Sequence, residues 1–277
     1  MGFILNRAYA IRDYSAELMR YGVREVVGDM DHEVVFVLDG IGGTQIAPLM
    51  MRRALRQTNA PIGSILFDWH CKPRGEIFGD LMWLRRNRLM GAKLARKLLA
   101  FRRAHPATRI HLSAFSGGAG IAVFACEHLA DKGVVDTLLL GCPALSPSYN
   151  LAPALRAVRR CYSLNSHRDR FLLGIGTTIF GTTDRRFGSA AGRLGFSVPP
   201  GAGPADLRMY ERLGQIQWIS SLRADKHYGG HTGWVSTAFL RRHLVPILHG
   251  EPLLPVHRGA IARDEPDENR HGGGPSR

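Results

Sequence analysis

The sequence predicts an α/β fold, with three α/β/α layers built around a mostly parallel sheet. Short runs of β-branched and apolar residues alternate along the chain with longer segments of helical periodicity. Residues 34–38, Val-Val-Phe-Val-Leu, are apolar at every position, which is typical of a strand covered by helices on both faces. Such sheets bind ligands beyond the carboxyl ends of their strands, so we look there for functional residues.

The chain begins with a predicted helix at about residues 7–21. Gly22 follows this helix and suits the left-handed conformation that often ends one. A short turn then leads into the first strand. The same apolar signature recurs along the chain, and the predicted strands cover residues 34–38, 62–67, 109–115, 134–140, 160–164 and 215–219.

Helical segments separate these strands, at residues 81–104, 118–131, 151–158 and 232–248. Within the first of them, residues 84–103 form an amphipathic pattern. The apolar stripe consists of Leu84, Gly91, Leu94, Leu98 and Phe101, and basic side chains lie opposite. The gap between the fourth and fifth strands, residues 141–159, is too short for a large cap domain.

A connection of unusual length separates the last two strands. It is rich in glycine and ends in a helix from Pro204 to about Leu213. Long ordered excursions above strand ends often form a lid or a pocket wall. We therefore expect residues 171–203 to be either a lid over the site or a surface insertion.

The length of 277 residues and the apolar content of 45% favour a single domain, residues 1–257. Residues 258–277 combine an acidic run with glycines and offer little to bury, so we expect a disordered tail. Phe3-Ile4-Leu5 is too short an apolar run for a signal peptide, and no stretch is long enough to span a bilayer. These features predict a cytoplasmic protein.

The formal net charge is +14, and no acidic residue occurs between Asp80 and Glu127. The basic face of helix 84–103 is expected to be a solvated surface or to interact weakly with anionic surfaces. No aromatic residues interleave the basic ones, so no specific nucleic-acid partner is predicted. The sequence leaves the oligomeric state open.

The cysteines carry no signature of a special site. Cys71, Cys126, Cys142 and Cys161 form no C-x-x-C pair, which argues against zinc and against a disulfide framework. We expect reduced, packed thiols, and neither a metal nor an organic cofactor is predicted.

A serine, an acid and a histidine follow predicted strands in that chain order: Ser116, Asp169 and His231. A serine hydroxyl needs a base within hydrogen-bond reach and a turn that exposes its oxygen. Small residues must lie two before and two after the serine because that turn is crowded, and here they are Ala114 and Gly118.

The stretch Ala114-Phe115-Ser116-Gly117-Gly118 resembles the G-x-S-x-G turn of the α/β-hydrolase superfamily, with alanine for the first glycine. The resemblance covers residues 34–248. It implies that Ser116 is the nucleophile, His231 the base and Asp169 the acid that orients it. It also implies an oxyanion hole formed by the backbone N–H groups of Ile41 and Gly117, although Asp39 stands where the family usually has histidine.

Two alternatives stay open for the acid and the base. Asp184 lies within the long connection and competes with Asp169, which we favour because a strand end is rigid. His227 competes with His231, which we favour because Gly230 precedes it directly before a predicted helix. For the pocket we expect contributions from four aromatic residues, Trp69, His70, Tyr149 and Trp234.

These observations predict a serine hydrolase that cleaves an ester or related acyl bond of a small-molecule substrate; acyl transfer to another acceptor is also compatible. One alternative is a catalytically silent binding protein of the same fold. Another is a nucleotide-binding module on the glycine-rich loop after the first strand, but Gln45 replaces the third glycine of that motif.

Overall fold

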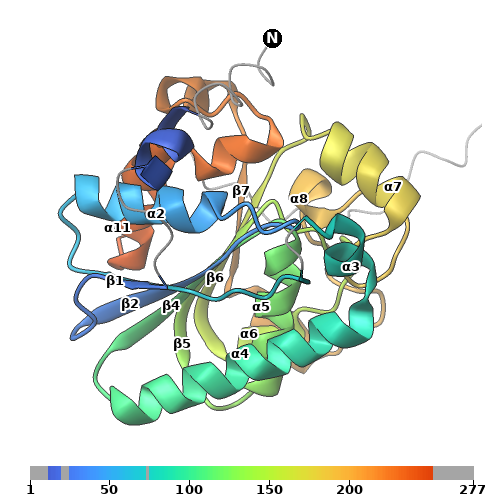
Figure 1. Cartoon of the computed structure of the whole chain (residues 1–277). Coiled ribbons are helices and arrows are strands. Elements are labelled where there is room, and N and C mark those ends of the chain that lie inside the picture. Colours follow the sequence, from blue (N-terminus) through green and yellow to red (C-terminus); the bar gives the residue numbers. More distant parts are fainter. Residues whose placement is uncertain (1–11, 20–24, 73–74, 252–277) are drawn as a thin grey trace, which may run out of the picture.

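The computed structural model describes residues 12–19, 25–72 and 75–251 (Figure 1). Its centre is a seven-stranded sheet in the order β1-β3-β2-β4-β5-β6-β7. All neighbouring strands are parallel except the edge pair β1 and β3. The strands are β1 (Val26–Val27), β2 (Glu33–Leu38), β3 (Gly63–Leu66), β4 (Arg109–Phe115), β5 (Val135–Gly141), β6 (Val158–Asn165) and β7 (Leu213–Gln217).

Helices cover both faces of this sheet, which confirms the predicted three-layer α/β/α class (Figure 1). Alternate residues of β2 enter different cores: Val34 and Phe36 join the cluster under α4 (Leu84–Ala104) and α5 (Gly117–His128). Val35 and Val37 join the cluster under α2 (Ile46–Gln57). The remaining α-helices are α3 (Ile77–Met82), α6 (Ala152–Arg156), α7 (Thr177–Phe180), α8 (Ala191–Leu194), α9 (Pro204–Tyr210), α10 (Thr237–Phe239) and α11 (Val245–Leu248). Two segments are π-helical, η1 (Phe171–Gly176) and η4 (Leu240–Leu244), and two are 3-10 helical, η2 (Ser220–Asp225) and η3 (His231–Val235).

Several boundaries differ from the predicted ones. Helix α2 and the short strand β1 were not predicted; Pro48 and the arginines of α2 obscure its apolar face. The predicted helix 81–104 is two helices, α3 and α4, which meet at Trp83. The predicted helix 232–248 is divided at Ser236, which is extended: η3 precedes this residue, and α10, η4 and α11 follow it without a gap.

The first predicted helix is described only over residues 12–19, where it is helical. It is fixed to α2 by Glu17, which is buried and forms ion pairs with Arg52 and Arg56. These guanidinium groups hold the pKa of Glu17 below its usual value, against the effect of burial. The predicted tail at 258–277 lies outside the described residues.

The amphipathic prediction for α4 is confirmed where it concerns the buried face. Gly91, Leu94 and Leu98 lie against the sheet and α5. Only α6 lies between β5 and β6, so the fold has no large cap there. Within the described residues, every helix is too short or too polar to cross a membrane.

Candidate active site

Ser116 lies in a sharp turn between β4, at the centre of the sheet, and α5. Its backbone has φ 54° and ψ −119°, a strained conformation for a residue with a side chain. Two hydrogen bonds hold it: the Ser116 N–H donates to the Gly141 carbonyl at 2.8 Å, and the Ser116 carbonyl accepts from the Ala144 N–H at 3.1 Å. The turn therefore presents the serine side chain beyond the strand end.

Small residues are required around this turn because other backbone segments approach it closely. A Cβ atom on Gly118 would lie 2.4 Å from the Asp39 carbonyl oxygen. A Cβ on Gly117 would lie 2.6 Å from Cγ2 of Ile41. The structure thus brings the loop after β2, which carries Ile41, directly against the start of α5.

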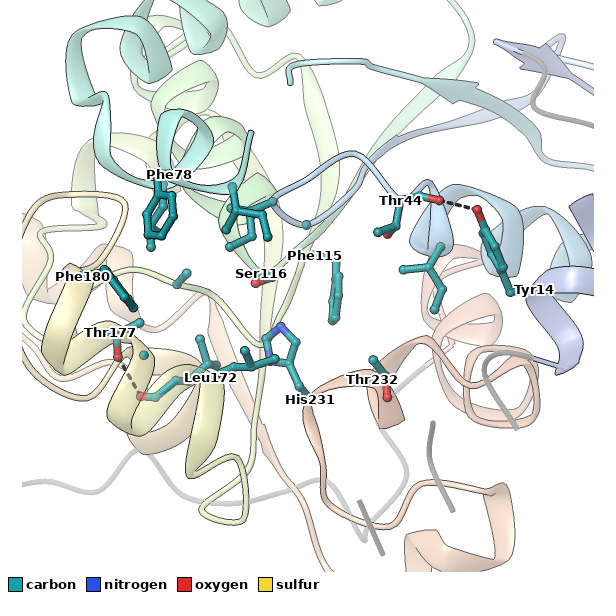
Figure 2. A pocket seen from close by; sticks show the side chains of 18 residues that line it. Tyr14, Thr44, Phe78, Phe115, Ser116, Leu172, Thr177, Phe180, His231 and Thr232 are labelled. Atoms are coloured by element: carbon teal, nitrogen blue, oxygen red, sulfur yellow. Dashed lines mark hydrogen bonds between the residues drawn. The ribbon is translucent and has the colours of Figure 1, made fainter. Parts of the chain in front are cut away.

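The structure joins His231 to Asp169. Nδ1 of His231 and Oδ2 of Asp169 are 2.5 Å apart, and both side chains are buried. A second bond links their loops, since Ser166 Oγ donates to the Gly229 carbonyl at 2.8 Å. With Nδ1 engaged, Nε2 is the nitrogen left for Ser116, and Figure 2 shows Ser116 and His231 directed into the same pocket.

The two alternative residues have other partners. Asp184 accepts hydrogen bonds from the Ser146 N–H at 2.9 Å, the Ser146 hydroxyl at 2.5 Å and the Thr182 hydroxyl at 2.6 Å. His227 is buried beneath Trp234, and burial lowers its pKa to about 3. The geometry therefore favours Asp169 and His231.

Asp39 organises the loop that carries Ile41. Its carboxylate accepts hydrogen bonds from the Thr44 hydroxyl and from the backbone N–H groups of Gln45 and Ala47. The side chain is fully buried, and burial raises its pKa. Asp39 therefore acts as an anchor for the loop where the resemblance would place a histidine.

His70 supports the same loop from the neighbouring strand end. Its Nε2 lies 2.7 Å from the carbonyl oxygen of Gly40, and its Nδ1 lies 2.8 Å from the Asp68 carboxylate. Both partners offer acceptor oxygens to the imidazole ring. The bond to Gly40 fixes the peptide plane that also contains the Ile41 N–H.

Cys142 lies beside the acid and the histidine. Its thiol donates to the His231 carbonyl at 3.3 Å, and ligand atoms of Cys142, Asp169 and His231 lie within 4.8 Å of one another. Metals bind the thiolate form of cysteine. Burial raises the pKa of this thiol well above its usual value, so the group suits packing better than metal binding.

The pocket above Ser116 has a volume of about 590 Å³. Its lining is mainly aliphatic and aromatic, and of its members only His231 can carry a charge near neutral pH. It is lined by Tyr14, Gly40, Ile41, Thr44, Ile46, Ile77, Phe78, Leu81, Phe115, Ser116, Ala144, Leu172, Leu173, Gly176, Thr177, Phe180, His231 and Thr232 (Figure 2).

The predicted aromatic lining is wrong. Trp69 and Trp234 are core residues with exposures of 0% and 1%, and neither they nor His70 and Tyr149 line the pocket. Trp69 instead donates its indole N–H to the Asp39 carbonyl at 2.9 Å. A residue just after a strand can face either the cavity or the core, and the sequence does not distinguish the two.

The long connection contributes one wall of the pocket through η1 and α7, residues 171–180. The part beyond α7 packs onto the body of the domain. There the Ala191 N–H donates to the Leu145 carbonyl at 2.7 Å and the Gly192 N–H donates to the Pro143 carbonyl at 2.8 Å. Only the first third of the predicted lid segment therefore borders the site.

The opposite walls were not predicted from sequence. Tyr14 comes from the first helix and donates its hydroxyl to the Thr44 carbonyl at 2.7 Å, while Ile77 and Phe78 come from α3. These segments are far apart in the sequence. Several apolar residues of α3 are not buried in the core, and this is only a weak indication that the helix borders a pocket.

No known protein family and no curated protein sequence matches this chain. Among solved structures, it is similar to a predicted CIB-like hydrolase from Thermoplasma acidophilum, at 13% identity and a TM-score of 0.44 over 83% of this chain and 95% of that one. Est1E from Butyrivibrio proteoclasticus, with ferulic acid bound, gives 12% identity and a TM-score of 0.44 over 83% and 98%. A cutinase-like protein from Cryptococcus sp. gives 12% and 0.41 over 82% and 100%.

The features of the chain itself define its fold. The sheet is parallel apart from its short edge strand, and the strained serine turn follows the central strand β4. Asp169 follows β6 and His231 follows β7, in the order Ser, Asp, His. The three-layer α/β/α architecture with a mostly parallel sheet, which the resemblance to the α/β-hydrolase superfamily implies, is thus confirmed.

Proposed function

We propose that the protein is a serine hydrolase that cleaves esters or related acyl compounds with an apolar acyl group. The observation that carries the proposal is the placement of Ser116 on a strained turn, in one pocket with a histidine that is bonded to a buried carboxylate. A strained backbone persists only where the surrounding structure enforces it, and such sites are often functional. The combination matches the requirements of an activated serine.

The proposed reaction begins when Ser116 Oγ attacks the carbonyl carbon of the substrate. The C–O bond forms as the hydroxyl proton moves to Nε2 of His231, while Asp169 holds Nδ1–H and stabilises the imidazolium. His231 then gives that proton to the leaving group, and the acyl group remains on Ser116. Water attacks this ester in the same way, which releases the acid and restores the serine.

Two backbone N–H groups are proposed to stabilise the negative oxygen of the intermediate. Gly117 opens α5, so its N–H has no partner within the helix. The Ile41 N–H belongs to the peptide group held by His70. The close approach of Gly117 to Ile41, where an added Cβ would lie 2.6 Å from Ile41 Cγ2, supports their pairing in an oxyanion hole.

The lining of the pocket supports a neutral, apolar substrate. Although the whole chain carries a net charge of +14, no arginine or lysine of the described residues lines the cavity. A nucleotide phosphate or a carboxylate group in the substrate would therefore lose its hydration there without gaining a cationic partner. This observation disfavours the nucleotide-binding alternative.

Labelling with a fluorophosphonate, read by intact mass, tests the proposal. We expect one adduct on the wild-type protein and none on Ser116→Ala or His231→Ala, because the reagent needs an activated serine. Ser148→Ala removes an exposed serine outside the site and is the matched control, which should label fully. An unlabelled but folded wild-type protein would instead support a silent binding protein of the same fold.

A further inference from the structure

One side of the pocket is bordered by segments with exposed apolar side chains, which we call the apolar rim: Ile77, Phe78, Trp83, Leu172, Ile179 and Phe180. Their exposures are 47%, 57%, 61%, 46%, 59% and 38%. Four of them, Ile77, Phe78, Leu172 and Phe180, also line the pocket. These four side chains therefore belong both to the pocket lining and to the exposed surface.

The apolar rim is formed by two segments, α3 with the following Trp83 and η1 with α7, which meet on one side of the pocket. The rings of Phe78 in α3 and Phe180 in α7 meet edge to face, with centroids 5.3 Å apart. Figure 1 shows α3 and α7 as neighbours at one end of the molecule. A contiguous patch of this kind on a protein surface commonly marks a site of interaction.

The charges beside the apolar rim are mostly cationic. Among the described residues, three exposed cations lie near the rim segments in the sequence: Lys72, Arg85 and Arg170. The exposed anion beside these segments is Glu76. Helix α4 begins immediately after Trp83 and adds further exposed cations along its length, at Lys93, Arg96 and Arg103. Apolar and aromatic side chains with adjacent arginine and lysine are the combination that binds anionic lipid interfaces.

We propose that the apolar rim docks on an anionic lipid surface, so that the pocket opens directly into the layer that supplies its acyl substrate. Docking would transfer the exposed rings and aliphatic groups out of water. The neighbouring cations would meet the negative headgroups. The substrate part of this inference rests on the proposed hydrolase function, whereas docking itself does not require catalysis.

Co-sedimentation with vesicles tests docking on the full chain carrying Ser116→Ala, so that no substrate is consumed. Vesicles of phosphatidylcholine with about 30% phosphatidylglycerol should bind the protein, and pure phosphatidylcholine vesicles should bind it roughly tenfold less. Raising the salt from about 0.05 M to about 0.5 M should weaken binding to the anionic vesicles. No binding to either vesicle would overturn the proposal.

Variants at the apolar rim identify the docking face. Trp83→Ser and Ile179→Ser remove rim side chains that do not line the pocket, and each should reduce vesicle binding roughly tenfold. Leu207→Ser changes an exposed apolar residue on α9, outside the apolar rim, and should bind like its parent. Equal binding by the rim variants and the parent would contradict the assignment.

Two further measurements separate this inference from its competitors. Trp83→Ser in the otherwise wild-type chain should hydrolyse a soluble short-chain p-nitrophenyl ester at the parent rate, yet lose most activity on vesicle-bound ester. If the soluble ester is not hydrolysed but vesicles still bind, the function fails and docking stands. If light scattering instead shows a dimer that Trp83→Ser abolishes, in a protein that binds no vesicle, the apolar rim is a self-association face and the lipid proposal is wrong.

Discussion

Asp169 and Asp184 differ in what their carboxylates contact, and this difference makes a sharp test. Asp169 bonds His231, so Asp169→Asn should lower kcat by about 10³- to 10⁴-fold, because an amide stabilises the wrong tautomer of the base and no imidazolium. The measurement is steady-state hydrolysis of a p-nitrophenyl ester.

Asp184→Asn is the matched control for Asp169→Asn. Its carboxylate bonds Ser146 and Thr182, so the change should affect stability by about 1 kcal/mol and leave kcat within a few fold. The reverse pattern, an inactive Asp184→Asn and an active Asp169→Asn, would reassign the acid to the long connection.

At the scale of elements, the contact between α5 and the loop after β2 sets the proposed oxyanion hole. Gly117→Ala would place a Cβ 2.6 Å from Ile41 Cγ2, so the loop must shift. Because one N–H donor of an oxyanion hole is worth about 10²- to 10³-fold in kcat, we expect a loss of at least tenfold with a smaller change in KM. Steady-state kinetics over a range of ester concentrations give both constants.

Gly203→Ala supplies the comparison for that substitution. Gly203 has φ −74°, and no atom lies within 4 Å of the position its Cβ would take. It should keep the parent kcat, and its thermal unfolding should match that of Gly117→Ala to within a few degrees. Normal turnover by Gly117→Ala would remove this loop from the proposed mechanism.

The elements also show what the sequence could reveal. Apolar runs identify strands that are largely buried, so β2 to β7 were found with small errors at their ends. The serine turn was recognisable because its requirements are local: Ser116 needs small neighbours at fixed offsets. Helix α2 was missed because Arg52 is buried there against Glu17, a tertiary ion pair that periodicity does not reveal.

The pocket was the least predictable part, for a related reason. Tyr14, Ile77 and Phe180 meet only through the folded chain, and nothing in their local sequences marks them as neighbours. Trp69 follows the end of β3 and Trp234 lies in η3, but both turn into the core.

For the whole molecule, two buried histidines predict acid sensitivity. Burial lowers the pKa of His111 to about 4 and that of His227 to about 3, against 6.5 in the unfolded chain. Below pH 6.5 the unfolded state therefore binds more protons than the folded state. The free energy of unfolding should fall as the pH drops from 6.5 toward 4, by up to about 1.4 kcal/mol per pH unit for each histidine.

Urea unfolding at pH 7.5 and pH 5.0 measures this dependence. His111→Gln should reduce the difference in unfolding free energy between the two conditions, because it removes one of the two titrating groups. His32→Gln changes an exposed histidine and should leave the difference unaltered. Equal stability of the parent at both pH values would refute the assignment.

The pocket wall at residues 171–180 has a consequence for how this chain can be modified. Asp169 precedes the wall and is held by His231, while Ala191 and Gly192 follow it and are bonded to the loop after β5. Both ends are therefore fixed independently of the side chains that face the cavity. We therefore expect that residues 171–180 can be replaced by segments of other length or composition between these two fixed ends. Such replacements would change the pocket wall, and with it the range of substrates, while the residues proposed to carry the chemistry stay in place.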